Sequence, residues 1–536
     1  MRADLLILCA RPWSDGARMG GADAIAVAGS GILAVGPEAS LEGLAGPSTR
    51  VLDAAGATVT PGLCDAHLHL VAWARARREV RLEGLRSRRE VLDAVARHIA
   101  AHPGTEPVVG RGWVAEGWEA PPDRASLDAV SGERVVLLHS KDYHALWVNG
   151  VALDRAGVTR TTPDPEGGIL LRSPAGEPTG VAREHAVLLF QPLEPPPAFD
   201  DDLERAREAA SILHAEGVTA IHDFEGEHEA GVLRALAGGP GPRLRVLMHV
   251  SRAGLDAALS AGIRSGDGDD GFRWGALKLF ADGTLGSRTA AVLEPFDDAG
   301  GCGLELLAPA ELRELVARAY AGGLSVAVHA IGDRAVRNAL DAFEANHRVE
   351  VRLMPRVEHA QLVHSRDLPR FAALGVAASM QPIHCTSDIP LVERAWATRA
   401  AHSYPWRALL ESGARLAFGS DAPVEEPRPA LGLHAAVTRA RADRPGAFMP
   451  AQCLTLDQAL TAYTEGPARL AGAWPREGRI APGAVADLVI WNADLHGIPA
   501  SRLPEACPRY TILEGRVVFE GVETAGPLPA TLGRVR

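Results

Sequence analysis

The chain of 536 residues is longer than one ordinary hydrophobic core requires, so we expect one large domain and at least one smaller one. Hydrophobic residues make up 47% of the sequence and charged residues 23%, proportions typical of a soluble globular protein. The net charge of −12 implies no broad basic surface, which argues against a nucleic-acid partner.

The six cysteines are scattered without C-x-x-C spacing and indicate neither a disulfide framework nor a zinc–thiolate cluster. No secretory signal is recognisable at the N-terminus, and no stretch approaches the roughly 18 apolar residues of a membrane span. We therefore expect a soluble protein of a reducing compartment, most simply the cytoplasm, with no membrane partner. A homodimer is expected only because it is the commonest oligomer.

Both ends of the chain are rich in short strands separated by turns. Residues 4–9 and 24–28 read as strands near the N-terminus, and residues 486–491 and 510–513 do so near the C-terminus. Because a different pattern separates these ends, we predict a small β domain assembled from residues 1–60 and 472–536.

Residues 61–471 alternate helices with apolar strands. A helix at 204–216 leads into a strand at 217–223, and a helix at 311–322 leads into a strand at 324–329. Repeated helix–strand units predict parallel strands, and in a (β/α)₈ barrel the residues at the carboxyl ends of the strands converge. The polar residues at such strand ends are His67, His69, Lys278, His329, His359 and Asp421.

Residues of about 72–200 do not fit a short barrel connection. They contain a predicted helix at 88–101, a tryptophan-containing loop at 111–118 and a Gly/Pro-rich passage at 164–179. We interpret them as a lid-like subdomain inserted near the mouth of the barrel, where long loops of this fold carry specificity.

His67 and His69 are spaced so that both point to the same face of a strand. Two imidazoles in an apolar segment indicate a metal site, although an isolated pair is more often hydrogen-bonded on a polar strand face. His329 and His359 could likewise be polar strand ends, and Asp421 could be a helix cap. Their shared position at successive strand ends favours one common site.

Lysine is rare in this chain, where Lys141 and Lys278 are the two lysines among 55 basic residues. Arginine stays protonated, whereas lysine can lose its proton and become carbamylated. We therefore treat Lys278 as a candidate for chemistry, with a buried ion pair to Asp282 as the alternative.

The strand-end residues form a nitrogen and oxygen donor set suited to Zn²⁺. Two metal ions would need a bridging anion, which a carbamylated Lys278 supplies. One ion would need only His67, His69, His329 and Asp421, with a water position left open. The metal lowers the pKa of bound water towards about 7, and Asp421 can accept that proton and pass it to a leaving nitrogen.

Several short segments stand out in the sequence: TPGLCDAHLH at 60–69, LKLFADGTLGSRTA at 277–290, VHAIGD at 328–333, VEHA at 357–360, GSDAPV at 419–424, GRGW at 110–113, LWVN at 146–149 and PGAVADL at 482–488. These segments resemble the amidohydrolase superfamily, and in particular the amidohydrolase family 3 branch that includes YtcJ-like proteins and N-substituted formamide deformylases. The resemblance extends from about residue 3 to residue 520.

The resemblance implies a TIM barrel of class α/β with a composite β-sandwich. It also implies metal-dependent hydrolysis of a carbon–nitrogen bond other than a peptide bond, on a small-molecule substrate. His67 and His69 would be ligands on the first strand, and Lys278 the carbamylated bridge between two zinc ions. His329 and His359 would be further ligands, and Asp421 both ligand and general base.

The insert departs from the branch pattern, with Tyr143 in place of a common glycine and Gly150 in place of a common serine. Within the insert and its surroundings, the expected substrate contacts are Trp113, Asp142, His144 and His384. The favoured substrates are N-acyl or N-formyl amines. A mononuclear deaminase on the same barrel and a catalytically silent scaffold are the alternatives.

Overall fold

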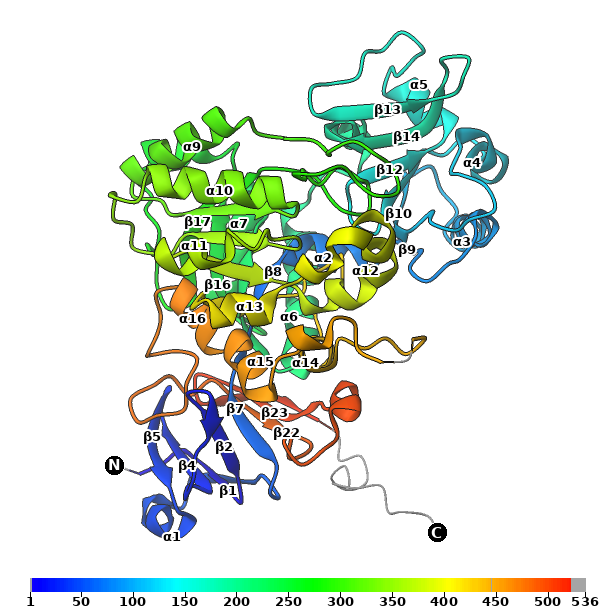
Figure 1. Cartoon of the computed structure of the whole chain (residues 1–536). Helices are drawn as coiled ribbons and strands as arrows, with labels where there is room; N and C mark the ends of the chain where they lie inside the picture. Colours follow the sequence, from blue (N-terminus) through cyan, green and yellow to red (C-terminus); the bar gives the residue numbers. More distant parts are fainter. Residues whose placement is uncertain (1, 445, 522–536) are drawn as a thin grey trace, which may run out of the picture.

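The computed structural model describes residues 2–444 and 446–521 of the chain. Figure 1 shows a barrel in the middle, strands from both ends of the chain below it, and a separate sheet at the upper right. None of the helices in the described ranges combines the length and apolar character that a membrane crossing requires. The last residues of the predicted β domain, 522–536, lie outside the described residues.

The central sheet contains eight parallel strands that follow one another in chain order, which confirms the predicted α/β barrel. The two edge strands are joined at their carboxyl ends, because the backbone N–H of Asp421 donates to the carbonyl of His67 (2.6 Å) and that of His69 donates to Ala422 (2.8 Å). The strands are β8 (Leu63–Leu68), β15 (Val218–Asp223), β16 (Arg245–Val250), β17 (Phe272–Phe280), β18 (Val326–Ala330), β19 (Arg356–His359), β20 (Ala377–Met380) and β21 (Leu416–Phe418).

Helices cover the outside of this barrel, and their apolar faces pack on the buried strands. The predicted helix at 204–216 begins earlier, at Phe199, where three aspartates in the first turn favour a helix N-terminus. The helices around the barrel are α2 (Leu70–Ala76), α6 (Phe199–Ala215), α7 (Glu227–Gly238), α8 (Leu255–Ser260), α9 (Pro309–Ala321), α10 (Asp333–Ala345), α11 (Leu368–Ala373), α12 (Pro382–Ala395), α13 (Trp406–Glu411), α14 (Pro429–Thr438), α15 (Leu456–Tyr463) and α16 (Glu465–Leu470).

The two ends of the chain form two sheets below the barrel, which confirms that both termini contribute strands to a β part. One sheet has the order β5-β4-β1-β6, and the other has the order β24-β23-β22-β7-β2-β3, so strands from the two ends pair directly. The strands are β1 (Leu5–Leu8), β2 (Arg11–Ser14), β3 (Ala17–Arg18), β4 (Ala24–Ala28), β5 (Gly31–Gly36), β6 (Arg50–Asp53), β7 (Thr58–Pro61), β22 (Leu488–Trp491), β23 (Pro508–Leu513) and β24 (Arg516–Glu520); helix α1 (Glu38–Leu41) follows β5.

Between α2 and α6 the chain forms a further six-stranded sheet with its own hydrophobic core. The boundaries of 72–200 for an inserted subdomain stay a prediction. The helix predicted at 88–101 has those bounds in the structure. The elements are β9 (Val80–Arg81), α3 (Arg88–Ala101), β10 (Val108–Trp113), α4 (Arg124–Ser131), β11 (Val136–Ser140), β12 (Ala145–Val148), α5 (Gly150–Arg155), β13 (Gly168–Arg172) and β14 (Pro178–Glu184).

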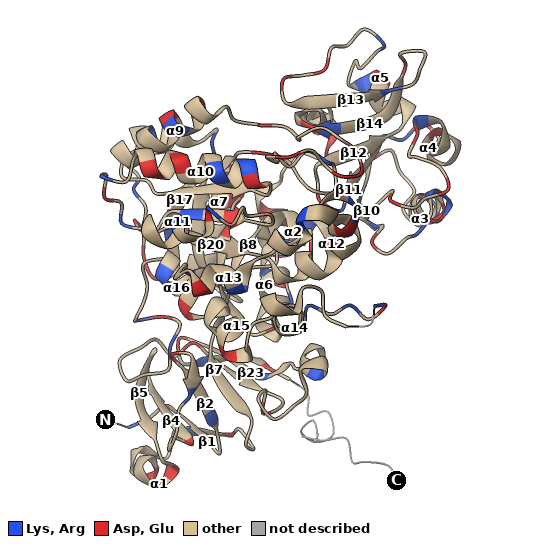
Figure 2. Cartoon of the chain, viewed as in Figure 1, with Lys and Arg blue, Asp and Glu red and all other residues tan. Residues whose placement is uncertain are grey.

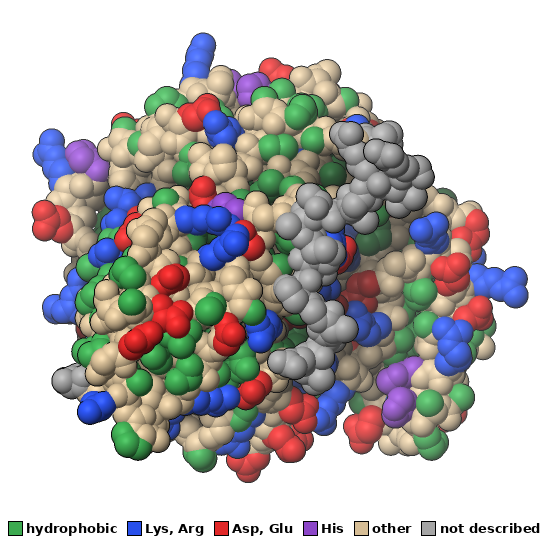
Figure 3. Space-filling model, turned by 90° about the horizontal axis from the view of Figure 1, so that it is seen from below, with side chains coloured by type: hydrophobic (Ala, Val, Ile, Leu, Met, Phe, Trp, Pro, Cys, Tyr) green, Lys and Arg blue, Asp and Glu red, His purple; other side chains and the backbone are tan. Residues whose placement is uncertain are grey.

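Charged residues of both signs are interspersed along the helices of the barrel and the insert (Figure 2). The view from below, onto the β part, shows the same mixture of acidic and basic side chains (Figure 3). On the face seen in Figure 3, therefore, acidic and basic side chains are mixed.

Candidate metal centre

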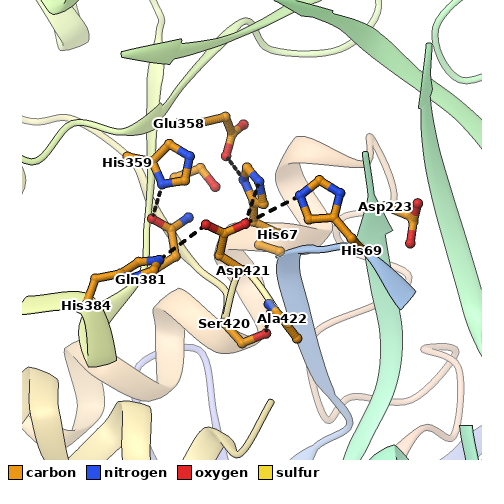
Figure 4. Close-up of polar contacts among 12 residues, drawn as sticks. His67, His69, Asp223, Glu358, His359, Gln381, His384, Ser420, Asp421 and Ala422 are labelled. Carbon is orange, nitrogen blue, oxygen red and sulfur yellow. Dashed lines mark hydrogen bonds and ion pairs between the residues drawn. The ribbon is translucent and has the colours of Figure 1, made fainter. Parts of the chain in front are cut away.

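His67 lies near the end of strand β8, and its side chain is almost completely buried. Its Nδ1 atom lies 2.6 Å from Oε2 of Glu358. Because a carboxylate only accepts, Nδ1 donates to Glu358, and Nε2 is directed towards Oδ1 of Asp421 at 3.4 Å (Figure 4). This outward hydrogen bond is the arrangement that normally orients a metal-binding histidine.

Glu358 is held by a buried arginine, because Arg356 donates to both of its carboxylate oxygens and also to the carbonyl of Ala66. Although burial acts in the opposite direction, the charge of Arg356 and the hydrogen bond from His67 keep the pKa of Glu358 well below its ordinary value. Glu358 is therefore ionised and keeps His67 in the tautomer that exposes Nε2.

His69 is not on the strand with His67, as the spacing predicted, but one residue beyond it, at the N-cap of α2. Its position is still fixed, because Asp223 accepts from the backbone N–H of Leu70 at 2.8 Å in the first turn of that helix. The Nε2 atom of His69 lies 3.4 Å from Oδ1 of Asp421, so both histidines point to the same carboxylate (Figure 4).

Asp421 follows strand β21 with a positive φ of 60°, which turns its carboxylate over the end of the barrel. Its second oxygen, Oδ2, lies 3.3 Å from Nε2 of His384 at the start of α12. Burial opposes ionisation, but His67 and hydrogen bonds from His384 and His69 hold the pKa of Asp421 well below its ordinary value. Asp421 is thus an ionised carboxylate surrounded by imidazoles.

His359 and His329 complete the ring of imidazoles from neighbouring strands, with ring centroids 4.5 Å apart. Nδ1 of His359 lies 2.8 Å from Oε1 of Gln381, which leaves Nε2 facing the site. His329 differs, because its Nε2 lies 3.1 Å from the carbonyl of Gly283, which leaves Nδ1 for a ligand.

Three residues, His67, His359 and Asp421, each offer one donor atom to a common point. These three atoms lie within 4.8 Å of one another, a separation that a single cation can span. Burial lowers the pKa of His67 to about 4 and holds those of His329 and His359 well below their ordinary value. These imidazoles are therefore neutral at pH 7, the form that binds a metal. The residues present fit a divalent ion.

Lys278 lies on β17 and is 2% exposed. Its Nζ atom lies 4.5 Å from the ring centroid of Phe224 and 4.8 Å from that of Phe280, and no hydrogen bond or ion pair reaches it within the described part of the chain. Burial lowers its pKa to about 8. The alternative pair with Asp282 does not form, because that carboxylate accepts from three backbone N–H groups, among them that of Gly332.

The remaining predicted residues have different surroundings. Asp142 and His144 lie between β11 and β12; Asp142 contacts the loop that follows β17, and the ring of His144 lies beside that of His329 on β18. His384 contacts Asp421 directly. Trp113 packs inside the insert, with its Nε1–H donating to the carbonyl of Leu138 at 2.7 Å, so its role as a substrate contact stays a prediction without a supporting contact.

Three residues that orient the site were not singled out in the sequence: Arg356, Glu358 and Gln381. Glu358 precedes His359, and successive residues on a regular strand point to opposite faces. His359 has a φ of 71°, so the backbone turns at this point and both side chains contact His67. The VEHA segment at 357–360 therefore indicates that Glu358 contacts His67 only when this backbone turn is known.

An eight-stranded parallel barrel with imidazole and carboxylate donors gathered at the carboxyl ends of its strands defines the class of metal-dependent barrel hydrolases. The chain belongs to the amidohydrolase family, whose model matches residues 50–519. This finding confirms the resemblance drawn from the sequence motifs.

Two relatives span most of the chain. It is 32% identical to YtcJ of Bacillus subtilis over 488 residues, which is 88% of this chain and 91% of that protein. It is 30% identical to the N-substituted formamide deformylase of Arthrobacter pascens over 547 residues, which is 96% of this chain and 98% of that protein.

A similar crystal structure is that of an uncharacterized metal-dependent hydrolase from Pyrococcus horikoshii. The identity is 26%, the TM-score is 0.74, and the similarity covers 90% of this chain and 96% of that one. The barrel and the additional sheets thus belong to an architecture found in metal-dependent hydrolases.

Proposed function

We propose that the protein hydrolyses the carbon–nitrogen bond of an N-acyl or N-formyl amine, with Asp421 as the general base. The observation that carries this proposal is the group of His67, His359 and Asp421, whose donor atoms lie within 4.8 Å of one another. The relative from Arthrobacter pascens, a deformylase by name, supports the choice of substrate class.

The proposed ligands are His67, His69, His329, His359 and Asp421, with Lys278 as a carbamylated bridge between two zinc ions. When bound, the metal would polarise the substrate carbonyl and lower the pKa of a water molecule. Asp421 accepts the proton of the attacking water, because its low pKa keeps it ionised, and then passes that proton to the leaving nitrogen.

Lys278 supports the two-metal form of the proposal. Carbamylation requires a neutral amine, and the pKa of about 8 together with the lack of a partner within the described residues makes the neutral fraction of Lys278 near neutral pH far larger than that of an ordinary lysine. A one-metal site would use the three-residue group alone, and it corresponds to the deaminase alternative. A homodimer and a cytoplasmic location stay predictions.

The test is hydrolysis of a panel of N-formyl, N-acyl, cyclic amide and ester compounds by zinc-loaded enzyme, with metal counted per chain. We expect activity on at least one amide, and a fall on the order of 10⁴-fold in kcat for Asp421→Asn, because that residue is proposed as both ligand and base. Asp256→Asn, a change at an exposed carboxylate, is the matched control.

The variant Lys278→Ala distinguishes a site with two zinc ions from a site with one. We expect this variant to lose one of two zinc ions and most activity, and carbon-13 bicarbonate should give a carbamate resonance in the wild-type protein alone. One ion per chain with full activity in Lys278→Ala would exclude the bridged site. Deamination without amide hydrolysis would favour the alternative reaction.

A further inference from the structure

A histidine of the insert reaches the metal centre from outside the barrel. His144 lies between β11 and β12, and its ring centroid is 5.8 Å from that of His329, with the two rings inclined by 29°. Its side chain retains 17% exposure although neighbouring groups surround it. His144 is therefore adjacent to a proposed ligand but belongs to a separate sheet.

Only one of the two ring nitrogens of His144 has a protein partner. Nδ1 lies 2.6 Å from Oε2 of Glu184, a buried carboxylate at the end of β14. Glu184 is the acceptor of this pair, so Nδ1 carries a proton. Although burial opposes it, the hydrogen bond to Glu184 and the charges of Glu184 and Asp142 raise the pKa of His144 to about 9, so the ring is an imidazolium at neutral pH and Nε2 carries a proton as well. Within residues 2–444 and 446–521 no hydrogen bond is made by Nε2, which leaves that atom available to a ligand in the site.

The Glu184 carboxylate is fixed from its other side by the loop that follows β17, because Oε1 accepts from Oγ1 of Thr289. The fit is close. A Cβ atom at Gly283 would lie 2.2 Å from that hydroxyl and 2.6 Å from Oε1 of Glu184. The carbonyl of Gly283 also accepts from His329, so one glycine packs between the proposed metal ligand and the support of His144.

A second carboxylate of the insert is bound by the same loop. Asp142 accepts from Oγ1 of Thr284 at 2.8 Å and from Oγ of Ser287 at 3.4 Å. It also accepts from the backbone N–H of His144 at 3.2 Å. The ring of His144 and its backbone are thus held independently, and both supports attach to the loop after the strand of Lys278.

We propose that His144 is a catalytic residue that donates a hydrogen bond from Nε2 to the substrate carbonyl oxygen, and that Glu184 is its positioning residue. This inference rests on the proposed amide hydrolysis, in which negative charge develops on that oxygen. A fixed donor aimed at such an oxygen is commonly worth 10²- to 10³-fold in kcat. A purely structural His–Glu pair would not require Nε2 to be free beside the metal ligands.

The test compares His144→Ala, His144→Gln and Glu184→Gln in zinc-loaded enzyme. We expect kcat to fall on the order of 100-fold in His144→Ala with KM changed only a few-fold. His144→Gln keeps an amide donor and should recover part of that loss, and Glu184→Gln should lose on the order of 10-fold. Zinc content and Tm should remain close to wild type, which separates this role from ligation or folding.

His185→Ala is the matched control, because His185 is an exposed neighbour of Glu184 bound to the backbone carbonyl of Glu166, and it should be unchanged. Wild-type kcat in His144→Ala, or loss of zinc from that variant, overturns the proposed role.

A binding readout separates this inference from the proposed function. Calorimetry with acetohydroxamic acid, which presents a carbonyl oxygen to the zinc-loaded protein, should give about 10-fold weaker binding in His144→Ala. Equal affinity in both proteins contradicts the role of His144. Wild-type enzyme that carries zinc but hydrolyses no compound of the panel contradicts the proposed function, and the affinity comparison still decides the role of His144.

Discussion

At the scale of single residues, hydrogen bonds to neighbouring side chains orient the proposed metal ligands. His67 is oriented by a carboxylate and His359 by an amide oxygen, so that both present Nε2 to the interior. The carboxylate of Glu358 is in turn fixed by Arg356, whose side chain is 2% exposed. The protein thus holds these imidazoles in place before a cation arrives, which favours binding.

Glu358→Gln tests this support. The amide cannot hold the charge-assisted bond to His67, so we expect zinc affinity to fall about 10- to 100-fold in competition with a chelator. Tm should also fall, because Arg356 loses its buried ionic partner. Glu344→Gln, which changes an exposed glutamate paired with Arg370, should retain wild-type values. Unchanged zinc affinity in Glu358→Gln would show that His67 needs no such support.

The candidate ligands could be found from the sequence because their residue types are restricted and recur at the ends of predicted strands. Their orienting partners could not, because the hydrogen bonds that Glu358 and Gln381 accept depend on the backbone turn at His359, which no residue pattern reveals. His359 and Asp421 both have positive φ values, and neither is glycine or asparagine. The strained backbone at these two positions explains why strand alternation failed there.

At the scale of elements, the insert is attached to the segment that follows the proposed base. Arg111 of β10 donates from Nη1 to the carbonyl of Pro423 at 2.9 Å, and Lys141 pairs through Nζ with Oε1 of Glu425 at 2.6 Å. Glu425 outweighs burial and raises the pKa of Lys141, so this lysine stays charged. The rarity of lysine therefore led to a structural ion pair at Lys141, whereas the amine of Lys278 has no ion-pair partner among the described residues.

Lys141→Met should loosen this attachment. We expect faster hydrogen exchange in residues 141–144 and 423–426, a KM raised several-fold, and a loss of only about 1 kcal/mol in stability because the pair is partly exposed. Lys141→Arg preserves the charge and should behave nearly as wild type. Exchange rates that do not change in Lys141→Met would contradict a role for this ion pair in holding the insert.

At the scale of the whole molecule, the β part closes the end of the barrel opposite the metal centre. Arg245 of β16 lies 2.6 Å, through Nε, from Oδ2 of Asp487, and both side chains are largely buried. At the junction of β7 and β8, a Cβ atom on Gly62 would lie 2.2 Å from Oγ1 of Thr219. The repeated helix–strand units predicted the order of the barrel, whereas these contacts between distant segments left no sequence signal.

Arg245→Met should weaken the contact between the two parts without altering the metal centre. Removal of one partner from a buried pair typically costs about 3–5 kcal/mol, so we expect a clearly lower Tm by calorimetry. Zinc content and kcat of the folded fraction should stay at the wild-type level. Arg352→Met, at an exposed pair with Asp267, is the control. A lowered zinc content with normal Tm in Arg245→Met would show that the contact between Arg245 and Asp487 influences the metal centre.

The pairing of β7 with β22 also determines when the protein can finish folding during its synthesis. Strand β7 is made before the barrel, but its antiparallel partner β22 leaves the ribosome only after the last barrel strand. Domains generally fold as units as they emerge, with N-terminal segments first. Strand β7 therefore has an unpaired edge while the barrel is being synthesised. During this period, chaperone binding would protect the N-terminal strands from aggregation.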